Sequence, residues 1–231
     1  MSTDNLTVEE ICSGVFHVRA TTQYHLTSTF MRLQEFYESP HSHIRNKYFT
    51  HEQYMDTCVG TARSSASDKF TYFEDWAGFN VPGNVFNKWV ELFSADYLWE
   101  KERRLVEMIS ERVTSNKFYV IGTSSGDDQP TVIDHELSHA WFYLDRKYKQ
   151  QMLKHVRSLS KTAYKHLRDH ILDEGYDLSV IDDEIQAYLA TNQMVDTVDM
   201  FPEKYRIPWS LVADFQQTFA AAREVKIDKD N

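Results

Sequence analysis

The apolar run TVIDHELSHAWFYL, residues 131–144, constrains this chain most, because it places ionisable side chains inside a helical pattern. Burying His135, Glu136 and His139 in an apolar helix is costly unless a metal ion or polar partners satisfy them. Helical residues four apart lie on one face about 5–6 Å apart, so the two imidazoles can bind one ion with Glu136 beside it. The segment therefore predicts a buried helix that carries a metal site.

Residues 135–139, HELSH, form an HExxH sequence, and this set of donors suits zinc. A Zn²⁺ ion bound by two neutral imidazoles and one carboxylate keeps a fourth position for water, whose pKa it lowers toward about 7. Glu136 is then expected to act as the general base that accepts the water proton. The alternative is that His135 and Glu136 face solvent on an amphipathic helix.

A third ligand must come from another segment, and the best candidate is IDDEIQAY, residues 181–188. HELSHA followed by DEIQAY resembles the gluzincin branch of the zincin metallopeptidases, over about residues 117–192. In that group the third ligand is a glutamate on a separate helix, often in an ExxA sequence, which residues 184–187 match. The resemblance implies a zincin-like domain with Glu184 as the third zinc ligand. The pairing also resembles a set of uncharacterised bacterial proteins that have an HExxHA helix and a DEIQAYL helix.

Two departures leave alternatives open around this third ligand. The position six residues after His139 is Asp145, so the HExxHxxGxxH sequence of the metzincins is not met. The gap from His139 to Glu184 is longer than in thermolysin-like enzymes, and Asp183 is an alternative ligand. The acids of residues 182–184 can also form a solvated helix N-terminus, which the helix dipole favours.

Further roles are assigned to groups around the ion. An oxyanion on a scissile carbonyl needs a donor besides the metal, and Tyr188, one helical turn after Glu184, is the first candidate. Tyr143, one turn after His139, is the second. Each tyrosine can equally be a core residue. Asp183 or Asp134 can accept the other N–H of a zinc-bound histidine.

Glycine and proline are scarce in the chain, with 7 and 5 among 231 residues, while charged residues make up 26% and aromatic residues 14%. This composition argues against a turn-rich sandwich or barrel and for a mostly α-helical α+β domain with a small sheet. No segment has the composition of a linker, so one domain over residues 1–231 is predicted. Its expected parts are a helical N-terminal part (1–115), a metal-site core (116–192) and a helical C-terminal part (193–231).

Hydrophobic periodicity predicts strands at about 14–19 and 117–123 and a loop over 70–83. Between residues 84 and 113 it fits one long helix or two abutting helices. Other helices are predicted at 22–38, 51–61, 130–144, 145–158, 160–173, 178–192 and 208–225.

Charge and cysteine content indicate the setting of the protein. A net charge of −10 and a pI near 5.4 make nucleic acids and membrane surfaces unfavourable partners. Cys12 and Cys58 are too few for a disulfide framework and are expected to be buried thiols. The N-terminal residues do not form a signal peptide, and no stretch approaches 18 apolar residues, which predicts a cytoplasmic protein.

These expectations lead to two hypotheses of function. The first is a zinc metallopeptidase acting on a peptide or protein substrate, with Glu136 and Tyr188 as catalytic residues and His135, His139 and Glu184 as ligands. The second is a non-peptidase zincin whose metal is structural or whose substrate is not a peptide.

Overall fold

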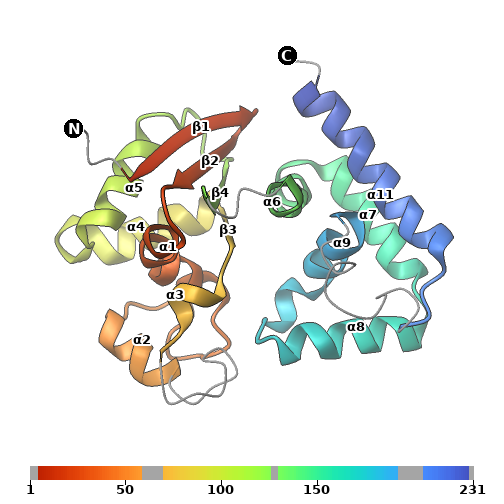
Figure 1. The fold of residues 1–231 in the computed structure, drawn as a ribbon, viewed down its shortest axis with the longest axis horizontal. Coiled ribbons are helices and arrows are strands. Elements are labelled where there is room, and N and C mark those ends of the chain that lie inside the picture. Colours follow the sequence, from red (N-terminus) through yellow and green to blue (C-terminus); the bar gives the residue numbers. More distant parts are fainter. Residues whose placement is uncertain (1–4, 59–69, 126–129, 192–204, 229–231) are drawn as a thin grey trace. The chain divides into compact units, whose positions relative to one another are not determined.

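A computed structural model describes residues 5–58, 70–125, 130–191 and 205–228 of the protein (Figure 1). The chain divides into two compact units, Met1–Asp128 and Gln129–Asn231, which we describe separately. The described residues are mostly helical and include a small mixed sheet, so the predicted α+β class is confirmed. None of the helices in these ranges combines the length and apolar character that a membrane span requires.

The first unit contains a four-stranded sheet with the order β1-β2-β4-β3. Strands β1 (Leu6–Cys12) and β2 (Val15–Ala20) pair antiparallel across a turn at Gly14, whose φ of 76° favours glycine. Strand β4 (Tyr119–Ser124) pairs parallel with β2 and antiparallel with β3 (Gly78–Pro82). All six residues of β4 are buried, as expected for a strand with neighbours on both sides.

The strands predicted at 14–19 and 117–123 correspond to β2 and β4, but the loop predicted over 70–83 was wrong. That segment forms the short helix α3 (Tyr72–Asp75) and strand β3. Its glycine and proline resemble turn signals, yet β3 is an edge strand, where a terminal proline such as Pro82 is tolerated. Strand β1 was not predicted, because exposed acids interrupt its alternation next to a register shift.

Helix α1 (Gln23–Glu38) packs on β2, β3 and β4, and Thr22 caps it by accepting the backbone N–H of His25. The pattern over 84–113 forms two helices rather than one, and a non-helical Ser94 with φ of 44° interrupts the first. The predicted helix at 51–61 begins as expected, while its last residues lie outside the described ranges. The remaining helices of this unit are α2 (His51–Cys58), α4 (Gly83–Tyr97) and α5 (Glu100–Ser110).

A buried ion pair joins α1 to α5. The guanidinium of Arg32 donates from Nε to Oε1 of Glu102 at 2.7 Å, and its NH2 group bonds the other carboxylate oxygen. It also donates to the carbonyl of Tyr97 at 2.9 Å and lies 4.9 Å from the ring centroid of Phe93. The two charged side chains are 2% and 0% exposed, so each depends on the other for compensation.

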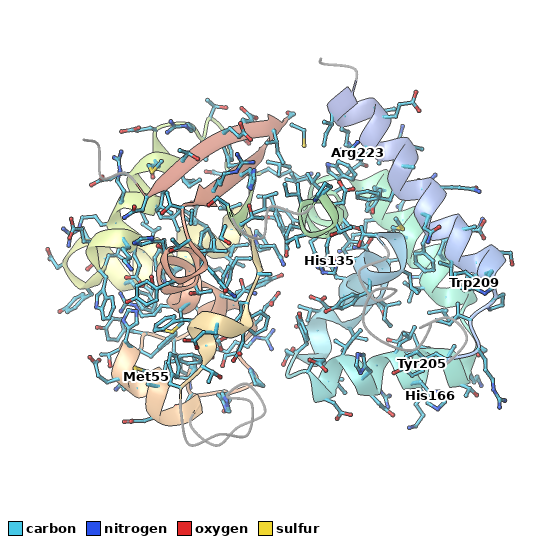
Figure 2. All side chains as sticks on the ribbon, in the orientation of Figure 1. Met55, His135, His166, Tyr205, Trp209 and Arg223 are labelled. Carbon is cyan, nitrogen blue, oxygen red and sulfur yellow. The ribbon has the colours of Figure 1, made fainter. Side chains whose placement is uncertain are left out.

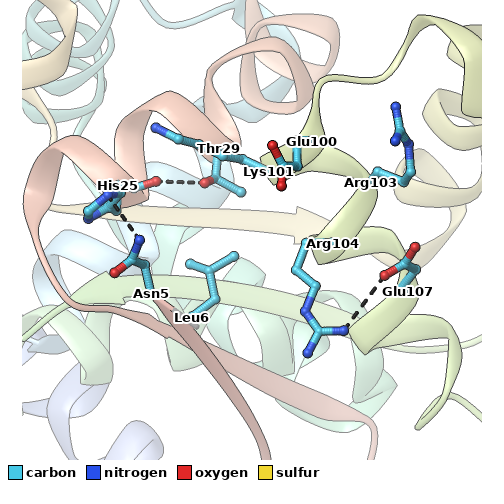
Figure 3. A pocket seen from close by; sticks show the side chains of 9 residues that line it. All are labelled: Asn5, Leu6, His25, Thr29, Glu100, Lys101, Arg103, Arg104 and Glu107. Carbon is cyan, nitrogen blue, oxygen red and sulfur yellow. Dashed lines mark hydrogen bonds and ion pairs between the residues drawn. The ribbon is translucent and has the colours of Figure 1, made fainter. Parts of the chain in front are cut away.

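A pocket of about 520 Å³ lies in the same unit beside α1 and α5 (Figure 3). The ammonium of Lys101 donates to Oγ of Ser28 at 2.6 Å, and Arg104 pairs with Glu107 at 3.6 Å. The wall of this pocket therefore carries both positive and negative side chains. The lining residues are Asn5, Leu6, His25, Thr29, Glu100, Lys101, Arg103, Arg104 and Glu107.

The described residues of the second unit form helices, and α9 (Ile181–Thr191) is central among them because it packs against α6, α7, α8 and α11. A short 3₁₀ turn (Leu178–Val180) precedes α9, and a π-helical turn (Glu224–Asp228) follows α11. The predicted helices are confirmed within a few residues. They are α6 (Pro130–Leu144), α7 (Arg146–Ser158), α8 (Lys161–Asp173) and α11 (Trp209–Arg223).

Asp145 separates α6 from α7, because its carboxylate accepts the backbone N–H groups of Lys147 at 2.8 Å and Tyr148 at 3.2 Å. This is the capping that an aspartate at a helix N-terminus provides. The residue at the position of a metzincin third histidine is therefore a helix cap.

The boundary between the units falls inside the predicted core of residues 116–192. Strand β4 is held in the first unit by its pairing with β2 and β3, whereas α6 packs on α7 and α9 in the second. The single domain stays a prediction. Cys12 is buried as expected, and the side chain of Cys58 lies outside the described part.

Candidate metal centre

The HExxH residues lie in the middle of α6, on the part of the helix that packs against α9 (Figure 2 labels His135). The exposed fractions of His135, Glu136 and His139 are 5%, 6% and 2%. The alternative of a solvent-facing pair therefore does not apply, and these polar groups must be satisfied inside the unit.

The two imidazoles and one carboxylate converge on a common point. The Nε2 atoms of His135 and His139 are 3.2 Å apart, and Oε2 of Glu184 lies 4.0 Å and 3.7 Å from them. Ligands of a tetrahedral zinc at about 2.0–2.1 Å are about 3.3–3.4 Å from each other. The nitrogens already have this spacing, and a small movement of the carboxylate would complete it.

Asp183 lies on the opposite side of the His139 ring. Its Oδ1 atom is 2.9 Å from Nδ1 of His139, while the Nε2 atom faces His135 and Glu184. In this position Asp183 accepts the Nδ1 proton and leaves the Nε2 lone pair available, which is the usual partner arrangement of a metal-binding histidine. Asp134, the other candidate for this role, instead accepts from Nε of Arg223 at 3.2 Å.

His135 has a weaker partner on its own Nδ1 side. This atom lies 3.5 Å from Oγ1 of Thr191, a hydroxyl that donates its proton to the carbonyl of Ala187 at 2.8 Å. The hydroxyl oxygen can therefore only accept from His135. When both imidazoles carry a single proton at Nδ1, as metal binding requires, their Nε2 lone pairs point toward each other and can share a cation.

The electrostatics of the cluster favour positive charge at this point. Burial, together with the charge of His139, lowers the pKa of His135 well below its usual value. Burial also opposes a charged His139, but the carboxylates of Asp183 and Glu184 outweigh it and raise the pKa of His139 to about 10. The same carboxylates would stabilise a divalent cation.

The acids of the first turn of α9 are not a solvated helix terminus. Asp182 accepts the hydroxyl of Tyr164 at 2.8 Å, and Glu184 is only 2% exposed. Within the described ranges, His135, His139 and Glu184 form the one group of potential metal ligands, with their ligand atoms all within 4.8 Å of one another.

Tyr188 and Glu136 also lie at the cluster. The ring of Tyr188 is 4.7 Å from that of His135, and burial and the charge of Glu184 raise the pKa of its hydroxyl, which stays a proton donor. Glu136 follows His135 on α6 and is 6% exposed, and its charge contributes to the raised pKa values of His139 and Tyr188. Tyr143, the second candidate, is partly buried on α6.

Three buried polar residues around the site were not singled out from the sequence. Ser138 and Gln186 are fully buried, and Tyr148 on α7 is 2% exposed. Gln186 lies three positions after Asp183 on α9, a spacing that places both side chains on one helix face. A glutamine three positions after Asp183 was the signal that the sequence offered. The contact with α7 required the tertiary structure.

Comparison of the chain with protein-family models, with curated proteins and with solved structures finds no match. The resemblance of HELSHA and DEIQAY to the gluzincins therefore stays a prediction. The function is therefore inferred from the side chains of the second unit.

Proposed function

We propose that the protein is a zinc-dependent hydrolase, specifically a metallopeptidase, whose ion is held by His135, His139 and Glu184. The observation that supports this proposal is the convergence of two imidazole nitrogens and one carboxylate oxygen within 4.8 Å, from two packed helices. This donor set is that of catalytic zinc sites, in which three protein ligands leave one position open.

Each surrounding residue has a role in this proposal. A zinc ion held by His135, His139 and Glu184 would supply a Lewis acid for the scissile carbonyl and would make the attacking water more acidic. The carboxylate of Glu136 accepts the water proton and later passes it to the leaving amine. The hydroxyl of Tyr188 donates a hydrogen bond to the developing oxyanion. Asp183 holds His139 in the tautomer that presents Nε2.

The deep burial of the cluster favours a second candidate, a zincin with a structural metal or a non-peptide substrate. The three ligand residues are at most 5% exposed. Structural zinc sites are usually closed by four protein ligands. Zinc-dependent turnover of a peptide library, compared with a panel of small esters and nucleotides, separates the candidates, and an inert but metal-loaded protein would favour the structural one.

We predict about one zinc ion per purified chain, and loss of stoichiometric zinc in His135→Ala, because one of three protein ligands is removed. Elemental analysis of both proteins measures this. His166→Ala is the matched control and should retain zinc. The ring centroid of His166 lies 5.9 Å from that of Tyr205, outside the cluster (Figure 2). Wild-type protein without stoichiometric metal, or His135→Ala with an undiminished content, would contradict the site.

A further inference from the structure

A chain of buried and partly buried hydrogen bonds leads from His139 away from the proposed zinc position. Oδ1 of Asp183, which is 2.9 Å from Nδ1 of His139, also accepts from Nε2 of Gln186 at 2.9 Å. Oε1 of Gln186 accepts from Oγ of Ser138 at 2.8 Å. The hydroxyl of Tyr148 is 2.8 Å from Oγ of Ser138 and 3.3 Å from Oε1 of Gln186.

The donors and acceptors of this chain fix the orientation of the Gln186 amide. The hydroxyls of Ser138 and Tyr148 have two protons for three contacts, so whichever of them donates to the other, the remaining proton goes to Oε1 of Gln186. With its oxygen accepting from a hydroxyl, the Gln186 amide must turn its NH₂ group toward Asp183. The carboxylate that receives this N–H is then fixed as the acceptor of the Nδ1 proton of His139.

Ser138, Gln186 and Tyr148 come from three different helices. Ser138 precedes His139 on α6, Gln186 follows Asp183 by one turn on α9, and Tyr148 lies in the first turn of α7. The Asp145 cap holds the start of α7 directly after α6, which brings the Tyr148 hydroxyl to Ser138. Burial raises the pKa of Tyr148, so its hydroxyl remains a donor.

We propose that Gln186, supported by Ser138 and Tyr148, is a positioning residue that orients Asp183 and thereby fixes the His139 tautomer that binds metal. This inference rests on the proposed zinc site and adds that the affinity of this site depends on residues that do not touch the ion. Partners of this kind typically contribute about 10–100-fold to metal affinity.

The test measures the zinc dissociation constant by competition with a chelator. Gln186→Leu removes both the amide oxygen that accepts from Ser138 and the NH₂ group that donates to Asp183, and should weaken zinc binding by about 10–100-fold. Gln186→Glu has nearly the same shape and still accepts from the two hydroxyls, but it cannot donate to Asp183 and places a second carboxylate there. It should therefore weaken binding as well, which a space-filling role would not predict.

Tyr148→Phe and Ser138→Ala are milder variants that should lower affinity in the same direction. Tyr164→Phe is their matched control, because it removes a hydroxyl bonded to Asp182, next to Asp183 on α9, without touching the chain of hydrogen bonds. Thermal unfolding of the metal-free proteins, together with the visible spectrum of their Co²⁺ forms, separates a loss of fold from a change at the ion.

The outcomes distinguish the two proposals. If wild type binds no zinc, the metal site and this inference fail together. If wild type binds zinc and the Gln186 variants bind it as tightly as Tyr164→Phe does, the inference alone fails. A spectrum and affinity altered by Gln186→Glu but not by Tyr164→Phe, with unchanged metal-free stability, would support it.

Discussion

Glu136→Gln should retain zinc and fold normally while losing about 10²–10⁴-fold in kcat, or about 3–5 kcal/mol of barrier stabilisation. Glutamine keeps the shape and the hydrogen-bonding reach of glutamate but cannot accept the water proton. His135 and His139 lie on either side of Glu136 in sequence and supply the helix-facing ligands, so the metal should not depend on it. The measurement pairs elemental analysis with hydrolysis of whichever peptide the library identifies.

Glu224→Gln is the matched control, because it makes the same change at an exposed position at the end of α11 and should leave the rate unaltered. Loss of zinc from Glu136→Gln would make Glu136 a ligand or a structural support. Activity near that of wild type would mean that it is not the general base.

Arg32→Met should lower the free energy of unfolding by about 3–5 kcal/mol, independently of any metal. The substitution leaves the carboxylate of Glu102, which is 0% exposed, without its bidentate partner. The carbonyl of Tyr97 also loses a donor. Urea unfolding followed by circular dichroism measures the loss.

Two further variants show whether the buried charge is the cause. The double variant Arg32→Met/Glu102→Met removes both charges and should recover part of the lost stability, because an apolar pair avoids the uncompensated carboxylate. Arg104→Met affects a pair that is 41% and 53% exposed, and should cost about 0–1 kcal/mol. A double variant no more stable than Arg32→Met would show that packing, and not charge, is responsible.

Local patterns predicted those elements whose own residues carry the signal. Strand β4 combines aromatic and β-branched residues, and α6 has apolar residues on both sides of its HExxH sequence. Strand β1 was not predicted because its exposed acids do not alternate with apolar residues. Strand β3 was not predicted because a glycine and a proline lie at its ends. The pairing of these edge strands with their neighbours decided their structure.

The candidate site also has one part that the sequence predicts and another that only the packed helices show. The convergence of His135 and His139 follows from their spacing on one helix, but the distance to Glu184 depends on how α9 packs on α6. Asp183 and Glu184 are adjacent in sequence, and only the packed helices place one on the Nδ1 side of His139 and the other near Nε2. The contact of Tyr148 with Ser138 likewise requires α7 to lie against α6.

Anomalous diffraction at the zinc edge, from crystals of the purified protein, tests the central proposal most directly. We expect one peak per chain, bonded at about 2.0–2.2 Å to Nε2 of His135, Nε2 of His139 and a carboxylate oxygen of Glu184. Asp183 should remain on the Nδ1 side of His139. A peak bonded to Asp183 with Glu184 turned away would reverse the assignment of the third ligand, and zinc-loaded crystals without a peak between the two histidines would contradict the site.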